Sequence, residues 1–464
     1  MQEQQQRLRA ASLSFIEVLA ASVALIGLTM TPVLIAPYMF SAAGNGSWLA
    51  YIFAAVMLLL VAICLNHFAR RTTASGSMFL YAASELGPAL GTLAGWSMLW
   101  AYVFVGAAQF GAQPLFIGML GDAAGIHIPV LLPMLLLAAI CWMLAARDIA
   151  LSTIVMLALE SISVAIICVV VGVVLFRHGP HIDAAQLHLQ GVGKASIGLG
   201  IATAIFSFVG FESATAFGDE ARSPLQSIPR AVIWSVIIAG AFFVLATYAE
   251  ILGLRDSKTP LDQLANPMQT LAALNGVSYL KIPLTIGAIF SSFSVALACV
   301  NTAARVMLPM AASGLLPSGL GAVNARFKTP QIALATVTIL MLLIGIAMYA
   351  RGVAPIDIFN FCGTLSSLSF IAIYLLIAIA STKYLRRVRD LRTLDVVVAV
   401  AASLCLIGTA VTLFYPVPPP PTTYFPYIFL LYLALGLLLF AVARRRVRIP
   451  QADVVATPPA VETP

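Results

Sequence analysis

Two carboxylic acids lie inside long apolar stretches of this chain. Glu160 sits in MLALESISVAII, and Glu212 sits in FSFVGFES. An ionised carboxylate inside a membrane is costly, so each acid must be paired, protonated or exposed to water. A carboxyl group that gains and loses a proton there can carry that proton between two faces of a membrane. The alternative for each residue is a carboxyl group fixed by hydrogen bonds between helices.

Helix-breaking residues interrupt two of the apolar stretches. Gly27 and Pro32 lie close together in VALIGLTMTPVLIAP, and Gly210 lies two residues before Glu212. Pro removes a backbone donor and clashes with the preceding turn, and Gly loosens a helix. Unwound backbone at membrane depth is tolerated only where it lines a cavity. There its amides and carbonyls can bind both charges of an amino acid. The simpler alternative is a kink, which is common in membrane helices.

Membrane-spanning helices must position these residues. Of the 464 residues, 61% are hydrophobic and only 9% are charged, whereas soluble domains carry about 25% charged residues. One span needs roughly 20 apolar residues, and the sequence contains twelve such runs, from 14–40 to 424–443. Because spans of this kind are helical in lipid, we predict an all-α integral membrane protein with 12 transmembrane helices.

Lys and Arg are concentrated in alternate loops. With twelve spans both termini lie on one side, and that side carries most of the basic residues. The positive-inside rule therefore predicts that both termini are cytoplasmic in a multi-pass protein of the cell (inner) membrane. The net charge of +7 reflects this topology, so we expect no nucleic-acid partner.

Enzyme and metal motifs are missing from the sequence. The six cysteines all fall inside predicted spans and form no CxxC pair, which argues against disulfides and zinc. There is no HExxH, GxSxG or GxxxxGK[ST] motif. We therefore expect no enzyme activity, no ATP-driven pumping and no cofactor.

The two interruptions fall in the first and sixth predicted spans, each of which opens a set of five. Paired interruptions at matching places indicate an inverted-repeat transporter with its site near the midplane. The predicted organisation is a cytoplasmic segment 1–12, a first repeat 13–195, a second repeat 196–380, two accessory helices in 381–443, and a tail 444–464 that is basic and then disordered.

The sixth span and its following loop read FSFVGFESATAFGDEARSPLQSIPRA. This pattern resembles the amino acid–polyamine–organocation transporters, which commonly show an aromatic residue, a small residue, Gly, an aromatic residue and an acid, then E-x-x-x-P-x-x-x-I-P-R-A. The stretches NTAARVMLPMAASGLLP and ASGSMFLYAASELGPALGTLAGWSMLWAY are similar to the family's eighth helix and second-to-third helix region. The resemblance implies a LeuT-like core of two inverted five-helix repeats plus two accessory helices.

The broken first helix departs from the family pattern. Relatives usually have Gly-Ser/Ala-Gly there, and its amides hold the substrate carboxylate. This chain has Met30-Thr31-Pro32, and Pro32 has no N–H. The change favours a substrate without a carboxylate, unless the hydroxyls of Thr29 and Thr31 compensate. Both hydroxyls could instead bond back to their own helix.

The resemblance also implies other residues of the binding site. Backbone carbonyls of the sixth helix would face a substrate amine, and Phe206 lies where related arginine/agmatine exchangers have a gating Trp. The predicted substrate-binding residues are Thr29, Met30, Thr31, Trp100, Phe206, Ser207, Val209, Gly210 and Asn360. Plain packing is the alternative for the aromatic residues.

The resemblance assigns the buried acids to coupling. Glu160 falls, to within one position, where proton-coupled relatives carry a Lys in place of a bound sodium ion. It could carry a proton, or hold sodium together with the hydroxyls of Ser291 and Ser294. Glu212 matches a glutamate that resembles a pH sensor in the exchangers.

Four charged residues are predicted to close the cytoplasmic face. Glu220, Arg222 and Arg230 lie in and beside the loop after the sixth span, and Arg305 lies near the inner end of the eighth. We interpret them as an ion-pair network, with solvated loop charges as the alternative for Arg222.

Together these features predict a secondary active transporter that moves a neutral, mid-sized amino acid by alternating access, with proton coupling. The alternative is a polyamine or organic amine transporter, or an amino acid exchanger, of the same fold. The expected partners are a small-molecule substrate and the lipid bilayer, with the protein a monomer or homodimer.

Overall fold

Apolar helices make up most of the chain that the structure describes. The computed structural model describes residues 13–72, 77–147, 149–179, 183–218, 220–415, 417 and 420–447. The predicted segment 1–12 and residues 448–464 of the predicted tail lie outside these described residues. The described residues contain no β-strand, only an isolated bridge between Leu13 and Ala221. The all-α prediction is confirmed.

The helices follow the predicted spans closely. The principal ones are α1 (Phe15–Ile26), α2 (Ala36–Ala43), α3 (Ser47–Ala69), α5 (Pro88–Ala123), α6 (Leu131–Arg147), α7 (Ile149–His178), α9 (Lys194–Phe208), α10 (Pro224–Gly253), α12 (Lys281–Ala312), α13 (Gln331–Ala350), α14 (Pro355–Arg387), α15 (Thr393–Phe414) and α16 (Phe425–Ala443). Shorter helices are α4 (Ser77–Leu86), α8 (Ala184–Leu187) and α11 (Pro267–Leu274).

Ten helical stretches of the described chain are long and apolar enough to cross a membrane. One of them is the 55-residue stretch Phe15–Ala69, and the shorter helix Leu131–Arg147 is also apolar. The 55-residue stretch is interrupted after Ile26 and again at Gly44–Gly46, where a 3-10 turn separates α2 from α3. The count of twelve spans and the two five-helix repeats stay predictions.

Lipid-facing side chains mark the outside of the bundle. In α6 the exposed residues Leu132, Leu135, Leu136, Ile140 and Met143 recur at helical spacing and form one apolar stripe. A stripe of large apolar side chains on the surface suits hydrocarbon and not water. This pattern supports a multi-pass membrane protein.

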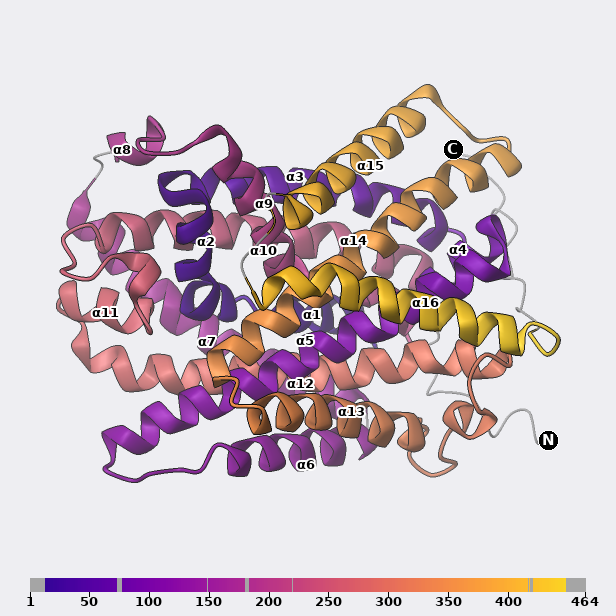
Figure 1. Cartoon of the computed structure of the whole chain (residues 1–464), viewed down its shortest axis with the longest axis horizontal. Coiled ribbons are helices and arrows are strands. Elements are labelled where there is room, and N and C mark those ends of the chain that lie inside the picture. Colours follow the sequence, from indigo (N-terminus) through magenta and orange to yellow (C-terminus); the bar gives the residue numbers. More distant parts are fainter. Residues whose placement is uncertain are drawn as a thin grey trace, which may run out of the picture.

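Helix α5 runs through the centre of the bundle. It packs against α12 and α14, and α6 and α13 lie together along one edge in Figure 1. Small residues allow these close contacts, as is usual between membrane helices. A methyl group at Gly106 would strike Met341 of α13, and one at Gly111 would strike the backbone carbonyl of Pro355 in α14.

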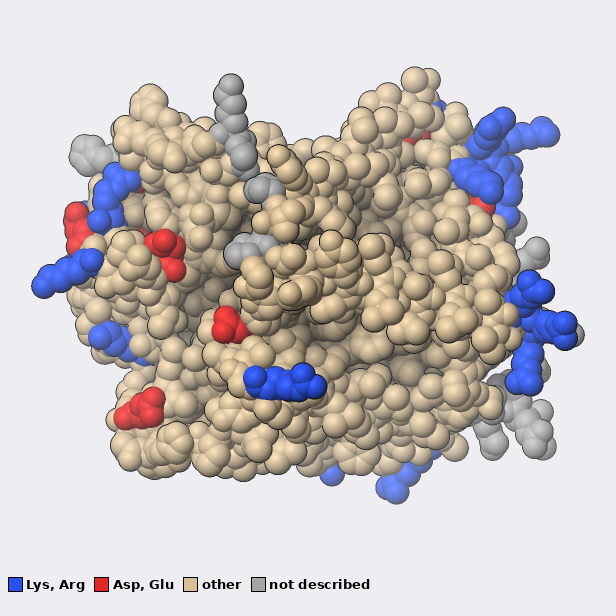
Figure 2. Space-filling view, viewed as in Figure 1, with Lys and Arg blue, Asp and Glu red and all other residues tan. Residues whose placement is uncertain are grey.

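The two ends of the bundle differ in charge. At one end, here called the basic end, Figure 2 shows Lys and Arg side chains gathered at the right-hand edge. Two ion pairs tie helices together there, Arg71 with Asp390 at 2.5 Å and Arg387 with Glu85 at 2.5 Å. The hydrogen bond from Arg71 lowers the pKa of Asp390. The α14–α15 turn and the end of α16 lie at this edge in Figure 1, and the Arg71–Asp390 pair brings the end of α3 to the same turn; these segments carry Arg70, Arg71, Arg386, Arg387, Arg389, Arg392, Arg444, Arg445 and Arg446.

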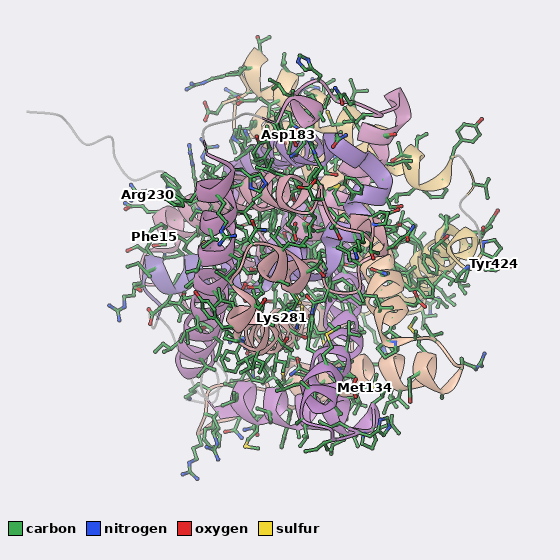
Figure 3. The ribbon with its side chains drawn as sticks, turned by 90° about the vertical axis from the view of Figure 1, so that its left-hand side faces the viewer. Phe15, Met134, Asp183, Arg230, Lys281 and Tyr424 are labelled. Carbon is green, nitrogen blue, oxygen red and sulfur yellow. The ribbon has the colours of Figure 1, made fainter. Side chains whose placement is uncertain are left out.

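Asp183 links several segments at the opposite end of the bundle, which faces the viewer in Figure 3. The carboxylate of Asp183 accepts hydrogen bonds from Arg255 and from Gln186 Nε2, the latter at 2.9 Å. The Asp183 N–H donates to the Tyr248 hydroxyl at 2.9 Å. Burial alone would raise the pKa of Asp183, but these donors outweigh it and hold the pKa below its ordinary value of 3.8. The loop that carries α8 is thereby fastened to the end of α10.

Replacing Asp183 by Asn is expected to lower the stability of the folded protein by about 1–3 kcal/mol at neutral pH, because Arg255 loses a charged acceptor. Because the folded-state pKa of Asp183 is lowered, the wild-type advantage is complete above about pH 4 and is lost as pH falls through that lowered value. Thermal unfolding of both proteins across acidic and neutral buffers tests this. A gap that persists undiminished in strong acid would contradict the assignment.

Candidate functional site

The first helix break begins at Gly27. This residue ends α1 with φ +64°, in the left-handed region that favours glycine, and its N–H still donates to the Val23 carbonyl. The chain then rejoins a helical path as a π-helical turn, Thr31–Ile35, before α2. A side chain at Gly27 would strike Val295 of α12, so both conformation and space require glycine. The predicted interruption of the first span is therefore present, with Pro32 inside the π-helical turn.

The second helix break lies directly against the first. Helix α9 ends at Phe208, and Gly210 follows with φ +109°. A side chain at Gly210 would meet both the side chain and the backbone of Leu25, in the last turn of α1. Beyond the break, Ser22 of α1 accepts hydrogen bonds from the N–H of Ala214 at 3.1 Å and from the Ser213 hydroxyl at 3.2 Å. Two segments about 180 residues apart thus meet at their interruptions.

Glu160 of α7 reaches into the first break. The Thr29 N–H donates to Glu160 Oε1 at 3.1 Å, and both residues are buried. Among the described residues, Glu160 Oε2 and the hydroxyls of Thr29 and Ser291 have no hydrogen-bond partner. The hydroxyls of Ser291 and Thr29 are nevertheless near enough to interact with the carboxyl group. The Ser294 hydroxyl donates to the Met156 carbonyl at 3.3 Å, so only Ser291 of the two predicted serines joins the cluster.

Glu212 is held between two tyrosines. Tyr102 of α5 donates to Oε1 and Tyr374 of α14 donates to Oε2, each at 2.7 Å. All three side chains are fully buried. Both carboxyl oxygens are therefore satisfied, and the acid joins the second break to two other helices. In this conformation the geometry matches the interhelical hydrogen-bond alternative for Glu212.

A small chamber and a wider vestibule adjoin the break segments, because Ile35 and Phe206 line the chamber and Val33 and Leu34 line the vestibule. The chamber measures about 30 Å³ and the vestibule about 290 Å³, and Tyr38 and Asn360 line both of them. Phe206 lines the chamber, while Asp262 and Gln263 line the vestibule. A space of 30 Å³ holds roughly one water molecule. An amino acid would therefore need movement of the chamber walls, and Phe206 is the aromatic side chain of α9 that could provide it.

Comparison with known proteins decides the family. Residues 20–450 match the family model described as amino acid permease. The chain belongs to the amino acid permease family. This agrees with the resemblance seen in the sequence.

Three relatives show which proteins this permease resembles in sequence. An uncharacterized transporter of Mycobacterium tuberculosis is 30% identical over 62% of this chain, and the match spans 63% of that transporter's length. The branched-chain amino acid permease BcaP of Bacillus subtilis is 24% identical over 63% of this chain and 65% of its own. The low-affinity putrescine importer PlaP of Escherichia coli is 27% identical over 63% of this chain and 66% of its own.

Phe206 of the permease is packed tightly against α14. Its ring contacts the Phe359 ring at a centroid distance of 5.3 Å. A methyl group at Gly363 would lie only 2.5 Å from the Phe206 ring. The absence of a side chain at Gly363 thus sets the position of the ring, which forms one wall of the chamber.

Replacing Gly363 by Ala is expected to push the Phe206 ring into the chamber and to weaken ligand binding more than stability. Overpacking of this kind costs about 1–3 kcal/mol, and the ring can relieve part of it only by filling the chamber. The check is the thermal shift produced by a bound ligand, compared with Gly118→Ala, where a methyl group meets nothing within 4 Å. Equal ligand shifts in the two variants would contradict a gating position for Phe206.

Other predicted binding residues are distributed around the breaks. The Thr31 hydroxyl is buried and, within the described chain, has no partner, so it does not bond back to its helix. Met30 is buried in the first break segment and Val209 in the second. The Ser207 hydroxyl forms a hydrogen bond with the Tyr51 hydroxyl at 3.1 Å. Trp100 lies apart, in an aromatic cluster with Trp96, Phe104 and Tyr432, so its place in a pocket wall stays a prediction.

The predicted cytoplasmic network reduces to one buried ion pair. Arg305 donates from Nε to Glu220 Oε2 at 2.7 Å and from Nη2 to Oε1 at 2.9 Å. Its guanidinium also lies 5.2 Å from the centre of the Phe217 ring. Arg222 and Arg230 have exposed side chains and form no ion pair with another described residue.

One buried acid escaped the sequence analysis. Glu250 of α10 is fully buried, and neither carboxyl oxygen has a hydrogen-bond partner in the described chain. Its surroundings, VLATYAEILG, are as apolar as those of Glu160. The same signal, an acid inside a predicted span, would have found it. No group of three or more His, Cys, Asp or Glu that could hold a metal occurs within the described part of the permease.

Proposed function

We propose that this permease is a secondary active transporter that moves a neutral, mid-sized amino acid across the cytoplasmic membrane by alternating access. The observation that carries the proposal is the contact between the two helix breaks, Leu25 against Gly210. Transporters with inverted repeats bind substrate and coupling ion at such interrupted helices. The Thr31 hydroxyl lies in the same segment, has no hydrogen-bond partner within the described chain, and can therefore bond to a ligand.

The proposed topology has twelve spans. The stretch Phe15–Ala69 supplies two of them and Leu131–Arg147 a further one, in addition to the other nine long stretches. The repeats are 13–195 and 196–380, with accessory helices in 381–443. The basic end is the cytoplasmic end, because Lys and Arg are retained on that side of the membrane.

The lining of the chamber supports a neutral substrate. Ile35, Ala202, Phe206 and Leu413 contribute apolar surface, and Asn360 contributes a polar group without charge. Relatives named as branched-chain amino acid permeases favour the same class. A diamine is the second candidate, because Pro32 cannot donate a hydrogen bond to a carboxylate and one relative is named a putrescine importer.

Glu160 is the proposed coupling residue. It is the buried acid that accepts a hydrogen bond from the backbone of the first helix break, through the Thr29 N–H. A change in its protonation would alter the hydrogen bonding of the break itself. A sodium ion held by Glu160 Oε2 and the hydroxyls of Thr29 and Ser291 is the alternative, since these oxygens lack partners in the described chain.

Uptake into proteoliposomes tests the proposal. Radiolabelled leucine and putrescine are each offered with and without an inward proton gradient, in sodium-containing and sodium-free buffer. We expect accumulation of leucine that requires the proton gradient and is abolished in Glu160→Gln. Accumulation of putrescine alone would move the substrate to amines, and a requirement for sodium would overturn proton coupling. Arg222→Gln, at an exposed position, is the matched control.

A further inference from the structure

Glu250 is a fully buried acid that the proposed mechanism leaves unused. It lies near the end of α10, one turn before Gly253. A side chain at Gly253 would contact Val174 of α7 and Leu271 of α11, so this part of α10 is enclosed by apolar helices. The exposed fraction of Glu250 is 0%. The acid therefore does not reach solvent along the helix surface.

No partner compensates the burial of this carboxyl group. Both oxygens lack a hydrogen bond in the described chain, as does the hydroxyl of Thr247 one turn earlier. Burying an unpaired polar group costs free energy, and an ionised one far more. Natural proteins keep very few such groups, and each calls for an explanation. An apolar residue would cost less free energy here, which makes Glu250 a candidate for a functional role.

The charged groups around Glu250 do not neutralise it. Asp183 and Arg255, at the same end of α10, are paired with each other. Arg177 of α7 has an exposed side chain and lies beside Gly276. Tyr51 of α3, which is also fully buried, packs its ring against Phe243 of α10, two turns before Glu250, at a centroid distance of 5.4 Å. In this conformation burial without a counter-ion therefore makes the ionised form of the acid much more costly than the neutral form.

Tyr51 connects this acid to the substrate region. Its hydroxyl shares a hydrogen bond with Ser207 at 3.1 Å, and Ser207 lies in the last turn of α9 before the break. Its ring packs against Phe208 and Phe243. Charging and hydration of Glu250 would disturb α10 two turns from Phe243, against which Tyr51 packs, and the Tyr51 hydroxyl is bonded to the last turn of α9.

We propose that Glu250 is a second proton-binding site, linked to the break of α9 through Tyr51 and Ser207. The carboxyl group holds a proton in the conformation described and releases it to water when the opposite end opens and hydrates it. The reaction is a simple transfer from the carboxyl oxygen to water, with no other bond made or broken. The proposal rests on the proposed transport function and adds a proton site on α10, separate from Glu160 on α7.

Infrared difference spectroscopy on the purified permease tests the proton directly. The carbonyl stretch of a protonated carboxylic acid should disappear between acidic and alkaline buffer in the wild type, and this band should be missing in Glu250→Gln. Glu160→Gln is the matched control, and it should keep the Glu250 band. The proposal is wrong if the bands of wild type and Glu250→Gln are the same.

Proteoliposome uptake gives the second readout. Glu250→Gln should exchange substrate across the membrane but lose stimulation by a proton gradient, and Tyr51→Phe should reduce that stimulation while retaining the band. Glu250→Leu should unfold at the same or a higher temperature than the wild type, which a structural role would not allow. Wild-type stimulation in Glu250→Gln would overturn the proposal. If the wild type moves no substrate, the proposed function fails and the infrared band alone decides the inference.

Discussion

Replacing Glu220 by Gln is expected to destabilise the permease by about 3–5 kcal/mol, because it leaves a buried positive charge without its counter-ion. The side chains of Arg305 and Glu220 are 1% and 0% exposed, so water cannot replace the lost carboxylate. Gln can accept one of the two hydrogen bonds from the guanidinium but cannot balance its charge. The Phe217 ring beside Arg305 offers only a weak substitute. Size-exclusion chromatography of heated samples would report the loss.

Two companion variants make this result interpretable. Arg222→Gln changes an exposed charge near Glu220 and should alter stability by no more than about 0.5 kcal/mol. The double variant Glu220→Gln with Arg305→Met removes both charges and should recover part of the loss, since the cost comes mainly from the stranded partner. A Glu220→Gln protein that survives heating as well as the wild type would show that the pair opens to water.

Replacing Gly210 by Ala is expected to abolish transport and to destabilise the fold. The φ angle of +109° is strained for any residue with a side chain, at a cost of about 1–3 kcal/mol. The new methyl group would also overlap the Leu25 side chain and approach its backbone carbon at 3.1 Å. The strain can be relieved only by separating the two breaks or by rewinding α9, and either change removes the proposed binding site. Uptake and thermal unfolding of the variant measure both effects.

A second substitution separates the two causes. Adding Leu25→Ala to Gly210→Ala removes the side-chain overlap but leaves the backbone angle, so it should restore only part of the stability. Gly408→Ala in α15 is the control, because a methyl group there meets nothing within 4 Å; alanine favours helices by up to about 1 kcal/mol over glycine. Full transport activity in Gly210→Ala would disprove a functional break at this position.

Local chemistry explains why the helix breaks could be predicted from the sequence. Gly27 and Gly210 stand out in otherwise smooth apolar runs, and both adopt positive φ angles in the structure. Apolar length likewise predicts where helices such as α13 and α16 begin and end. These features depend on neighbouring residues alone, so one sequence is enough to reveal them.

Partners across helices could not be predicted in the same way. Tyr102 and Tyr374 meet at Glu212 only because α5 and α14 present the right faces to it. Successive helix residues turn by about 100°, so Trp100, two positions from Tyr102, points into a different cluster. The sequence shows which residues are on a helix, but the rotation of that helix depends on all of its neighbours.

The two ends of the molecule also differ in their sensitivity to dissolved salt. The Arg255 side chain that pairs with Asp183 is 43% exposed, whereas that of Arg305 is 1% exposed. Mobile ions screen water-accessible charges over about 10 Å at 0.1 M, but they screen buried pairs far less. High ionic strength should therefore loosen the loop that carries α8, while the buried pair of Arg305 with Glu220 stays closed. Raising the salt concentration on one face of the membrane is then an experimental means of favouring conformations in which the end that carries Asp183 and Arg255 is open.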